Sequence, residues 1–460
     1  MNALIQTTIG ESRGLPRFWL EGKRLAKAGF EAGQRLRLSI HKGRVVLRSL
    51  KAGEHGESVR VSHRSRTQQP LLEVRGDFLA KLFGAGARVV IKMRKGRMSI
   101  ARHHLDQRQA ARGARLIERL HRGEPLRVAS MYHGGGVIDC AIHEGLRETG
   151  AASYCALASE IEGKYIEASL RNNPHLFRDD SLILNAPVEQ LNFSGGRLPE
   201  VEVLVGGVPC TGASSSGKAR NRIAHAEQHA SAGAQFYAYL RMVELLSPAV
   251  VILENVPGYQ STASYAVVLS VLKTLGYRVT DRVLDGNEFG ALEGRERLAM
   301  VAVCESLEGF EIEDVAPVER KPATLAEVLD DAAETADKWR DYAYLRDKEA
   351  RDKAAGKGFR RQLLTPEAER VPTITREYQK VRSTDPQLAH PSDPRLSRLF
   401  TPAEHARIKG IPGRIIEGLS ATVAHEVLGQ SVVFPAFRAL GRALGQWMQR
   451  LATAPATMAA

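Results

Sequence analysis

The feature that most constrains the fold is a series of apolar segments that starts at Leu126. Segments beginning at Leu126, Tyr154, Val201 and Val250 are each short and rich in apolar residues, and stretches with an amphipathic helical pattern separate them. Strands that are buried on both faces of a sheet have this near-continuous apolar character. Their alternation with helices predicts an α/β fold, in which helices cover both faces of a mostly parallel sheet.

The first two apolar segments end in residues that suit a nucleotide or nucleoside ligand. The first passes into Gly134, Gly135 and Gly136, and the second ends at Glu160 followed by Ile161. Glycines allow a sharp turn and a close approach of a ligand to the backbone, and an acid at the end of the second strand commonly accepts hydrogen bonds from ribose hydroxyls. Each feature alone is also compatible with an ordinary turn or strand end, but together they predict a ligand cradle.

The third and fourth segments end in residues with reactive side chains, a thiol and a carboxyl group. The third leads through Pro209 to Cys210, and the fourth ends in Glu254 and Asn255. The carboxyl ends of parallel strands meet at the ligand-binding edge of a sheet. A cysteine there is accessible and can react as a thiolate, and a neighbouring carboxyl group can handle a proton. The sequence therefore predicts a nucleophile and a proton donor or acceptor at one edge.

The cysteines also bear on metals and on the compartment. The chain has four of them, Cys140, Cys155, Cys210 and Cys304, and none is spaced as Cys-x-x-Cys or Cys-x-x-His. We therefore expect no metal site and a reducing compartment. The chain has no run of about 18 apolar residues, which a membrane-spanning helix requires, so we expect no membrane span. The N-terminal residues lack the basic, apolar and small-residue regions of a secretory signal, so we expect a cytoplasmic protein.

Positive charge is concentrated in the first part of the chain. Residues 1–127 contain 28 Lys and Arg against 10 Asp and Glu, a net charge of +18, whereas the remaining residues have a net charge of −5. A basic region beside a nearly neutral one is typical of a protein that binds a polyanion, most simply nucleic acid. A solvated basic surface with no partner is the alternative.

The basic region contains an internal repeat. The segments 20–33 and 74–86 are similar, and each is followed by an alternating run, at residues 35–40 and 88–93, by Lys-Gly-Arg, and by a second short strand. Each copy predicts a short helix that ends at glycine and then a β-hairpin. Residues 16–103 resemble the AbrB-like swapped-hairpin family, including its SymE-type members, in which two such units form one small β-barrel. This resemblance implies DNA binding, or RNA binding in some members; an oligomerisation or docking module is the alternative.

The later motifs resemble those of the DNA (cytosine-5) methyltransferase family. The matching segments, in order, are VGGVPC at 205–210, LENVP at 253–257, GALEGRER at 290–297, RLFTPAE at 398–404, KGIP at 409–412 and GQSVVFP at 429–435. The resemblance covers about residues 125–450. It implies a Rossmann-like S-adenosylmethionine-dependent methyltransferase domain with a smaller target-recognition domain, beside the N-terminal β-barrel module.

The resemblance implies a mechanism and a set of catalytic residues. The thiolate of Cys210 adds to C6 of a cytosine that is flipped out of the duplex, and Glu254 holds or protonates N3. Carbon 5 then takes the methyl group, and loss of the C5 proton expels Cys210. Asn255 is expected to orient Glu254 and the Cys210 loop, and Arg295 and Arg297 to approach the flipped base and neighbouring phosphates.

The same resemblance assigns the methyl donor, S-adenosylmethionine, to the glycine loop 134–136 and to Glu160, Ile161, Pro209 and Ser431, with no metal. The chain departs from the family pattern near these residues. His133 stands where the family usually has Gly, Thr211 and Glu293 stand where it usually has Gln, and Gln430 stands where it usually has Asn. These departures leave Cys210, Glu254 and both arginines in place and put the affinity for the methyl donor in question.

The domain plan follows from these assignments. It comprises the basic tandem module at 16–103, a linker helix at 104–124, a catalytic domain at 125–304 plus 418–450, a target-recognition domain at 305–417 and a tail at 451–460. Within the target-recognition domain, residues 371–378 and Arg395 are candidates for DNA contacts, with a plain surface charge as the alternative for any one arginine. The amino-acid sequence does not reveal which DNA sequence is the target.

The expected partner is double-stranded DNA, with a restriction endonuclease of the same restriction-modification system as a further partner, and the expected state is a monomer. Two alternatives to a DNA methyltransferase remain open. One is a DNA-binding regulator whose methyltransferase body has lost its activity, which the altered cofactor loop favours. The other is an enzyme that methylates cytosine in RNA, which the N-terminal module would also suit.

Overall fold

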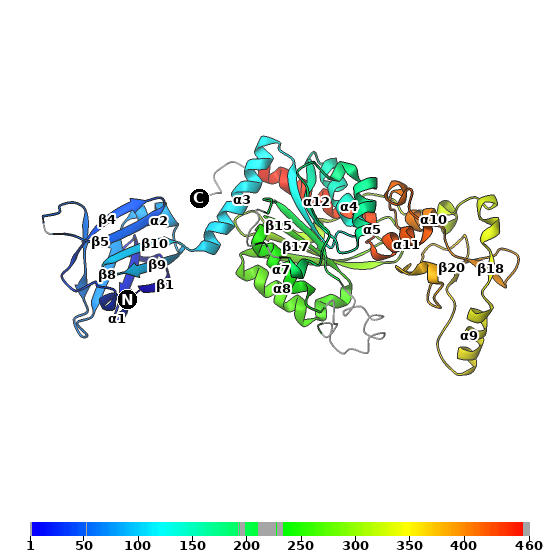
Figure 1. Cartoon of the computed structure of the whole chain (residues 1–460), viewed down its shortest axis with the longest axis horizontal. Coiled ribbons are helices and arrows are strands. Elements are labelled where there is room, and N and C mark those ends of the chain that lie inside the picture. The colour runs from blue at the N-terminus through cyan, green and yellow to red at the C-terminus, as the bar shows by residue number, and fades with distance from the viewer. Residues whose placement is uncertain are drawn as a thin grey trace. The chain divides into compact units, whose positions relative to one another are not determined.

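The computed structural model describes residues 2–51, 53–191, 193, 198–209, 227 and 233–453. These residues form two compact units, one ending at Ala111 and the other beginning at Arg112 (Figure 1). Each unit is described below by itself.

The N-terminal unit consists of two antiparallel sheets and two short helices. The larger sheet has the strand order β1 (Asn2–Thr8), β9 (Arg88–Arg94), β10 (Arg97–Arg102), β5 (Arg44–Ser49), β4 (Arg35–His41), β6 (Ser58–Arg60). The smaller sheet has the order β2 (Gly10–Ser12), β3 (Leu15–Glu21), β8 (Pro70–Arg75), β7 (Ser62–His63). The helices are α1 (Lys23–Lys27) and α2 (Asp77–Phe83). Apolar side chains from both sheets and both helices form one core.

The internal repeat of the sequence is a structural repeat. Each copy runs strand, helix, hairpin: β3-α1-β4-β5 and β8-α2-β9-β10. The copies meet where β3 pairs with β8 and where β5 pairs with β10. Both hairpins have two-residue turns with positive φ at each residue: 47° at Lys42 and 70° at Gly43, 28° at Lys95 and 70° at Gly96. This backbone matches the right-handed twist of the flanking strands. Strand β1 also pairs with β9, so the sheets include residues before the expected start at 16.

The second unit contains a seven-stranded sheet. Its order is β13 (Leu182–Leu184), β12 (Ser153–Ser159), β11 (Leu126–Met131), β14 (Val203–Gly207), β15 (Val250–Asn255), β17 (Glu296–Cys304), β16 (Tyr277–Asp285). The first five strands in this order are parallel, and the last two are antiparallel to their neighbours. The predicted α/β fold with a mostly parallel sheet is therefore confirmed.

Helices cover both faces of this sheet. Alternate strand residues point to opposite faces: Val203 and Val205 belong to one core, and Leu204 between them belongs to the other. The helices of the unit are α3 (His104–Arg122, from Arg112 onward), α4 (Val137–Glu148), α5 (Gly163–Asn172), α7 (Gln235–Leu246), α8 (Ala263–Thr274), α9 (Ala343–Ala354), α10 (Pro402–Ile408), α11 (Ala421–Gln430) and α12 (Phe434–Thr453). Helices α4 and α12 lie on one face, and α7 and α8 lie on the other (Figure 1).

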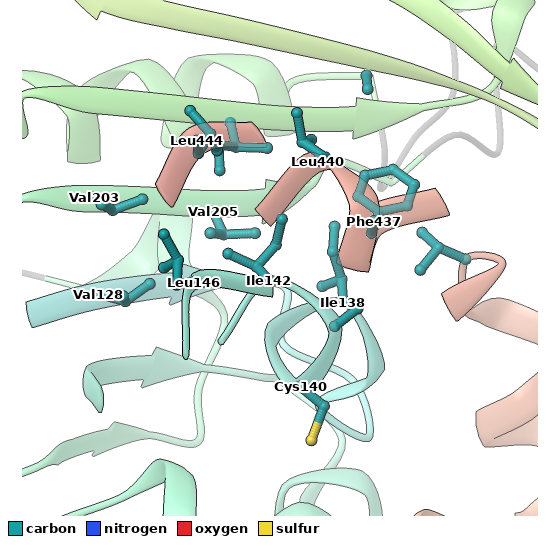
Figure 2. Close-up of a cluster of buried hydrophobic side chains, with 14 of the residues drawn as sticks. Val128, Ile138, Cys140, Ile142, Leu146, Val203, Val205, Phe437, Leu440 and Leu444 are labelled. Carbon is teal, nitrogen blue, oxygen red and sulfur yellow. The ribbon is translucent and has the colours of Figure 1, made fainter. Parts of the chain in front are cut away.

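The core beside α4 and α12 anchors the strand ends that matter for function. Figure 2 shows Ile142 and Leu146 of α4 and Leu440 and Leu444 of α12 in one core with Val203 and Val205 of β14. The two helices approach closely because each presents a glycine: a Cβ at Gly145 would collide with the backbone of α12. Helix α4 begins directly after the glycine loop, so this packing fixes the loop against the sheet.

Helix α3 is more than a linker. From Arg112 onward it packs on the second unit, with Leu116 fully buried in the core. The guanidinium group of Arg112 is buried and donates to the carbonyl oxygens of Leu275 at 2.7 Å and Gly276 at 2.6 Å. The part of the helix from Arg112 onward therefore belongs to the second unit.

The segment expected to form the target-recognition domain has a small core of its own. It contains a four-stranded sheet in the order β18 (Arg340–Asp341), β21 (Leu396–Arg398), β20 (Gln387–Ala389), β19 (Leu363–Leu364). A separate apolar cluster includes Leu325, Tyr378 and Phe400. Residues 307–315 and Ile411, by contrast, pack in the core of the large sheet. Both ends of the segment therefore pack on the large sheet. No described helix of the chain is long and apolar enough to cross a membrane.

Candidate active site

The residues singled out in the sequence gather at one edge of the seven-stranded sheet. Strands β11, β12, β14 and β15 run parallel, so their carboxyl ends lie side by side. The glycine loop follows β11, Glu160 follows β12, Pro209 follows β14, and Glu254 and Asn255 end β15. Cys210 lies outside the described residues, which end at Pro209 on this side of the gap.

Glu254 and Arg297 form an ion pair at this edge. Strand β17 runs antiparallel beside β15, and the Nε atom of Arg297 lies 3.0 Å from Oε1 of Glu254. The side chains of Arg297 and Glu254 are only 14% and 16% exposed, respectively. On the neighbouring strand β14, a Cβ at Gly207 would lie 3.0 Å from Oε2 of Glu254. The glycine therefore leaves space on the side of the carboxyl group that the arginine does not occupy.

Burial raises the pKa of Glu254, and the positive charges of Arg297, Arg295 and Lys409 oppose this effect. Burial acts in this direction because a low-dielectric environment disfavours the charged carboxylate. A carboxyl group with a raised pKa holds its proton to a higher pH than an exposed glutamate does. Such a group is better suited than an exposed glutamate to donate a proton in catalysis.

Asn255 ties together two strand ends. Its side chain is buried, and Nδ2 donates to the carbonyl oxygen of Val208 at 3.1 Å. Its Oδ1 accepts a hydrogen bond from the backbone N–H of Val256 at 2.9 Å. The asparagine thus fixes the backbone just before Pro209 relative to the strand that carries Glu254.

Arg295 differs from Arg297 in its surroundings. Arg295 is 5% exposed, and its Nη2 donates to the carbonyl oxygen of Gly429 at 3.1 Å. It therefore points to the end of α11, whereas Arg297 reaches Glu254. Of the two arginines that the sequence assigns to the flipped base, Arg297 is the one that the structure brings to the carboxyl group.

A buried lysine that the sequence analysis did not single out completes this charged cluster. Lys409 has no exposed surface, and its Nζ donates to the carbonyl oxygens of Leu428 at 2.5 Å and Ser431 at 3.0 Å. It also lies 3.4 Å from Oε2 of Glu293, whose Oε1 accepts from the backbone N–H of Ile374 at 2.7 Å. Burial lowers the pKa of Lys409 well below its usual range. The sequence offered two signals, since Lys409 opens the KGIP motif and Glu293 is an acid at a position where the family usually has Gln.

The glycine loop has little room for side chains. Gly134 and Gly136 have φ angles of 57° and 76°, which only glycine adopts readily. A Cβ at Gly135 would lie 2.5 Å from Cγ1 of Val427 in α11. A Cβ at Gly134 would lie 3.3 Å from Nε2 of Gln430. The loop is thus pressed against the end of α11.

His133 packs beneath this loop. It is 2% exposed, its Nε2 lies 2.8 Å from Oγ of Ser169, and its Nδ1 lies 3.0 Å from Oδ2 of Asp139. The Oγ atom of Ser130 donates to the same Asp139 oxygen at 2.8 Å. The imidazole is therefore part of an interior hydrogen-bond network.

Ligand atoms of His133, Asp139 and Cys155 lie within 4.8 Å of one another, a grouping that resembles a metal site. Burial raises the pKa of the Cys155 thiol well above its usual range, which disfavours the thiolate that binds metals. The hydroxyl of Ser130 also bonds to the Asp139 carboxylate. We assign these residues a structural role under the glycine loop.

Glu160 holds the glycine loop to the end of β12. Its Oε2 accepts from the N–H of Gly134 at 2.7 Å, and its Oε1 accepts from the N–H of Glu162 at 2.9 Å. The next residue, Ile161, is 62% exposed. A carboxylate has further lone pairs for ligand hydroxyls, so the pair offers a polar and an apolar contact.

The residues at the end of α11 complete this region. Gln430 is partly buried, and among the described residues its Nε2 has no hydrogen-bond partner. The hydroxyl of Ser431 donates to the carbonyl oxygen of Leu428 at 2.7 Å. A buried amide next to a glycine loop suits a polar ligand, because buried polar groups are normally paired. The cradle thus fits a ligand that contains a nucleoside.

The segment 371–378, a candidate for DNA contacts, is largely interior. Val371, Ile374 and Tyr378 are fully buried in the apolar cluster of the small sheet. These three side chains therefore serve packing, and Thr373 and Arg376 are the exposed residues of the segment. Arg395 is exposed and forms a bidentate ion pair with Asp393.

Comparisons with known proteins identify the second unit. A family model described as C-5 cytosine-specific DNA methylase matches residues 127–446. The Type II methyltransferase M1.ScrFI of Lactococcus lactis subsp. cremoris is 26% identical over 261 residues, which are 55% of this chain and 64% of that protein. The Type II methyltransferase M.NlaX of Neisseria lactamica is 29% identical over 255 residues, 53% of this chain and 75% of that protein. The chain thus spans just under two thirds of the first of these relatives.

A comparison with solved structures agrees on the fold. The S. pombe Dnmt2 methyltransferase has a TM-score of 0.54 and 17% sequence identity, and the similarity covers 71% of this chain and 99% of that one. At this identity the likeness establishes the fold of the second unit, a methyltransferase fold.

Proposed function

Because this chain belongs to the C-5 cytosine-specific DNA methylase family, we propose that it transfers a methyl group from S-adenosylmethionine to carbon 5 of cytosine in DNA. The observation that carries the proposal is the Glu254–Arg297 ion pair, at 3.0 Å, beside the strand end that leads to Cys210. A nucleophile and a carboxyl group with a raised pKa are the two groups that attack on a cytosine ring requires.

The proposed reaction begins with a cytosine flipped out of the duplex. The thiolate of Cys210 forms a bond to C6, and Glu254 donates its proton to N3, so that the ring can accept the electron pair. Carbon 5 becomes nucleophilic and bonds to the methyl group, while the bond from this methyl group to the donor sulfur breaks and its electron pair stays on the sulfur. A base then removes the C5 proton, the C5–C6 double bond forms again, the C6–S bond breaks to release the thiolate, and N3 returns its proton to Glu254.

The other residues of the edge position these groups. Arg297 holds one oxygen of Glu254 and leaves Oε2 available for the base. Asn255 anchors the backbone before Pro209, and through it the approach to Cys210. Arg295 and the Glu293–Lys409 pair join β17 to the end of α11. In this proposal Arg295 is a positioning residue, and Arg297 contacts the reacting base.

S-adenosylmethionine supplies the methyl group when it is bound. Its site in this proposal comprises Gly134, Gly135, Gly136, Glu160, Ile161, Pro209 and Ser431. The glycine loop gives space for a close backbone approach, Glu160 offers lone pairs to ribose hydroxyls, and exposed Ile161 offers an apolar contact. Calorimetry with the methyl donor alone tests this site, and Ile161→Asp is expected to weaken binding.

The remaining assignments are also proposals. The N-terminal unit, as an AbrB-like module, binds nucleic acid, and residues 305–417 recognise the target. Double-stranded DNA is the partner, the chain acts as a monomer, and a restriction endonuclease belongs to the same system.

Bisulfite sequencing of DNA from cells that express the chain tests the proposed function. New methylated cytosines at a common short sequence are expected, and Cys210→Ser should abolish them. A parallel assay with labelled methyl donor and either DNA or RNA separates the substrates. Transfer to RNA alone would replace DNA as the substrate, and no transfer to either would favour a regulator that only binds DNA.

A further inference from the structure

The six-stranded sheet of the N-terminal unit carries a row of arginines across four adjacent strands. The pairing registers place Arg94 of β9 opposite Arg97 of β10, Arg97 opposite Arg48 of β5, and Arg48 opposite Arg37 of β4. Neighbouring strands are about 4.8 Å apart, so the row is about 14 Å long. Like charges placed directly opposite each other destabilise a sheet, so this row calls for an explanation beyond folding.

The core fixes which face of the sheet carries this row. Residues that alternate with the arginines, such as Leu36, Leu47, Ile91 and Met98, are buried in the core of the unit. The side chains of a strand alternate between its two faces, and a shift by one residue would exchange them. The basic residues are therefore held on the outward face by the packing of the other face.

The outward face carries basic residues on every strand of this sheet except β1. We call it the arginine face, and it consists of Arg35, Arg37, Arg44, Arg48, Arg60, Arg88, Lys92, Arg94 and Arg97. None of the six strands of this sheet contains an acidic residue or a Phe, Tyr or Trp. Lys42 and Lys95 add two exposed charges at the hairpin turns.

Most of these charges have no carboxylate partner within the described part of the chain. Arg48 pairs with Glu54 and Arg88 with Asp106, but no ion pair involves Arg37, Arg94 or Arg97. The smaller sheet of the same unit is the opposite case. There Arg17 and Arg75 lie near Glu73, and Arg64 pairs with Glu21 at 2.7 Å. Among the described residues, most arginines of the larger sheet thus have no carboxylate partner, whereas these three arginines beside the smaller sheet do.

We propose that the arginine face binds the phosphate backbone of duplex DNA without reading its sequence. This inference deepens the proposed nucleic-acid binding of the N-terminal unit, and it takes the choice of DNA from the proposed function. Guanidinium groups match phosphate oxygens with two parallel hydrogen bonds. A row of about 14 Å is long enough to reach phosphates on both sides of a major groove about 12 Å wide.

The composition of the face argues for a duplex. Proteins that bind single-stranded RNA or DNA on a sheet stack bases on aromatic side chains. The strands of this sheet contain no Phe, Tyr or Trp on which unpaired bases could stack. Contacts to phosphate position a protein but carry no sequence information. The arginine face therefore supplies affinity, and the tethered second unit recognises and modifies the base.

The test compares two triple variants of the full-length chain. Arg37→Gln, Arg94→Gln and Arg97→Gln together remove three unpaired charges from the arginine face. Arg17→Gln, Arg64→Gln and Arg75→Gln together remove the same charge from the smaller sheet and serve as the matched control. Binding to a fluorescent duplex is measured by anisotropy over a range of salt concentrations, without methyl donor, and thermal melting checks that both variants fold.

The arginine-face variant is expected to lose at least tenfold in affinity at low salt. The slope of log K against log salt should fall by about 2 to 3, since each phosphate contact contributes about 0.9. The control should keep the wild-type slope. An unchanged slope in the arginine-face variant, or an equal loss in the control, would overturn the proposal. A greater loss for RNA than for duplex DNA would overturn the choice of DNA. Because the assay contains no methyl donor, its result does not depend on whether methyl transfer occurs.

Discussion

Positive charge is used in two different ways in the two units of this protein. In the second unit, Arg295, Arg297 and Lys409 are largely buried, and each has defined partners at an edge of the large sheet. On the arginine face, Arg37, Arg94 and Arg97 are exposed and have no ion-pair partner among the described residues. The first arrangement fixes geometry, and the second leaves charge available to a partner.

The difference has an energetic basis. Breaking a buried ion pair leaves an uncompensated charge in a medium of low dielectric constant, which is strongly destabilising. An exposed charge is screened by water and salt, so its removal changes stability little and changes binding in a salt-dependent way. The comparison predicts large, cooperative effects in the second unit and small, additive effects in the first.

The largest effect is expected at Glu254. Replacing Glu254 by Gln keeps a hydrogen-bonding group beside Arg297 but removes the transferable proton. We expect methyl transfer to fall about 100- to 10,000-fold, the usual contribution of a general acid or base. Single-turnover transfer of labelled methyl measures it. Glu200→Gln, an exposed glutamate before β14, is the control and should retain full activity. Activity within tenfold of wild type would mean that Glu254 does not handle the proton.

The next effect concerns stability. Lys409→Gln removes the cation beside Glu293 and weakens the hydrogen bonds to Leu428 and Ser431. We expect the free energy of unfolding to fall by about 3 kcal/mol, as when one partner of a buried pair is lost. Adding Glu293→Gln should restore part of it, because the buried negative charge is then gone. Urea denaturation of both single variants and the double variant measures the coupling, and purely additive losses would contradict the role of this pair.

How far the sequence predicted these features depends on the range of the interactions. The parallel strands, the glycine loop and the residues at the strand ends were identified because apolar runs and turn residues are local signals. The hairpins were identified because the repeat showed the same local pattern twice. The methyltransferase fold is confirmed, but the description of the site stops at Pro209, so the position of Cys210 remains a prediction.

Interactions between distant segments were not predictable in the same way. Nothing local pairs Lys409 with Glu293, and nothing local turns Arg295 toward Gly429 while Arg297 reaches Glu254. The sequence also did not show which side chains of residues 371–378 are buried, because their burial depends on distant residues of the small core. The part of this segment in DNA contacts stays a prediction. The arginine row was also not predictable from the sequence, because these arginines become neighbours only through the pairing register of four strands.

A smaller effect concerns pH. Protonated Glu254 is the active form in the proposed reaction, so the rate should fall as pH rises through its raised pKa. The positive charge of Arg297 lowers the pKa of Glu254 and so opposes the effect of burial. Arg297→Gln should therefore move the fall in rate to higher pH. The normalised pH profile of single-turnover methyl transfer measures the shift. Arg282→Gln on the neighbouring strand β16 is the control and should leave the profile in place, and a shift of the Arg297→Gln profile to lower pH would reverse the assignment.

The smallest effect is expected at the two hairpin turns. Lys42 and Lys95 have positive φ angles, although asparagine is favoured before glycine in such turns. Replacing both by Asn should raise the stability of the N-terminal unit by about 0.5 kcal/mol, because Asn tolerates this conformation better. The same variant should bind duplex DNA more weakly, with a smaller salt slope, since two exposed charges beside the arginine face are lost. Thermal melting and anisotropy measure the two quantities. If stability rises while DNA binding weakens, the lysines are retained for a partner, as the contrast between buried and exposed charge requires. Unchanged DNA binding would instead confine the interface to the strands.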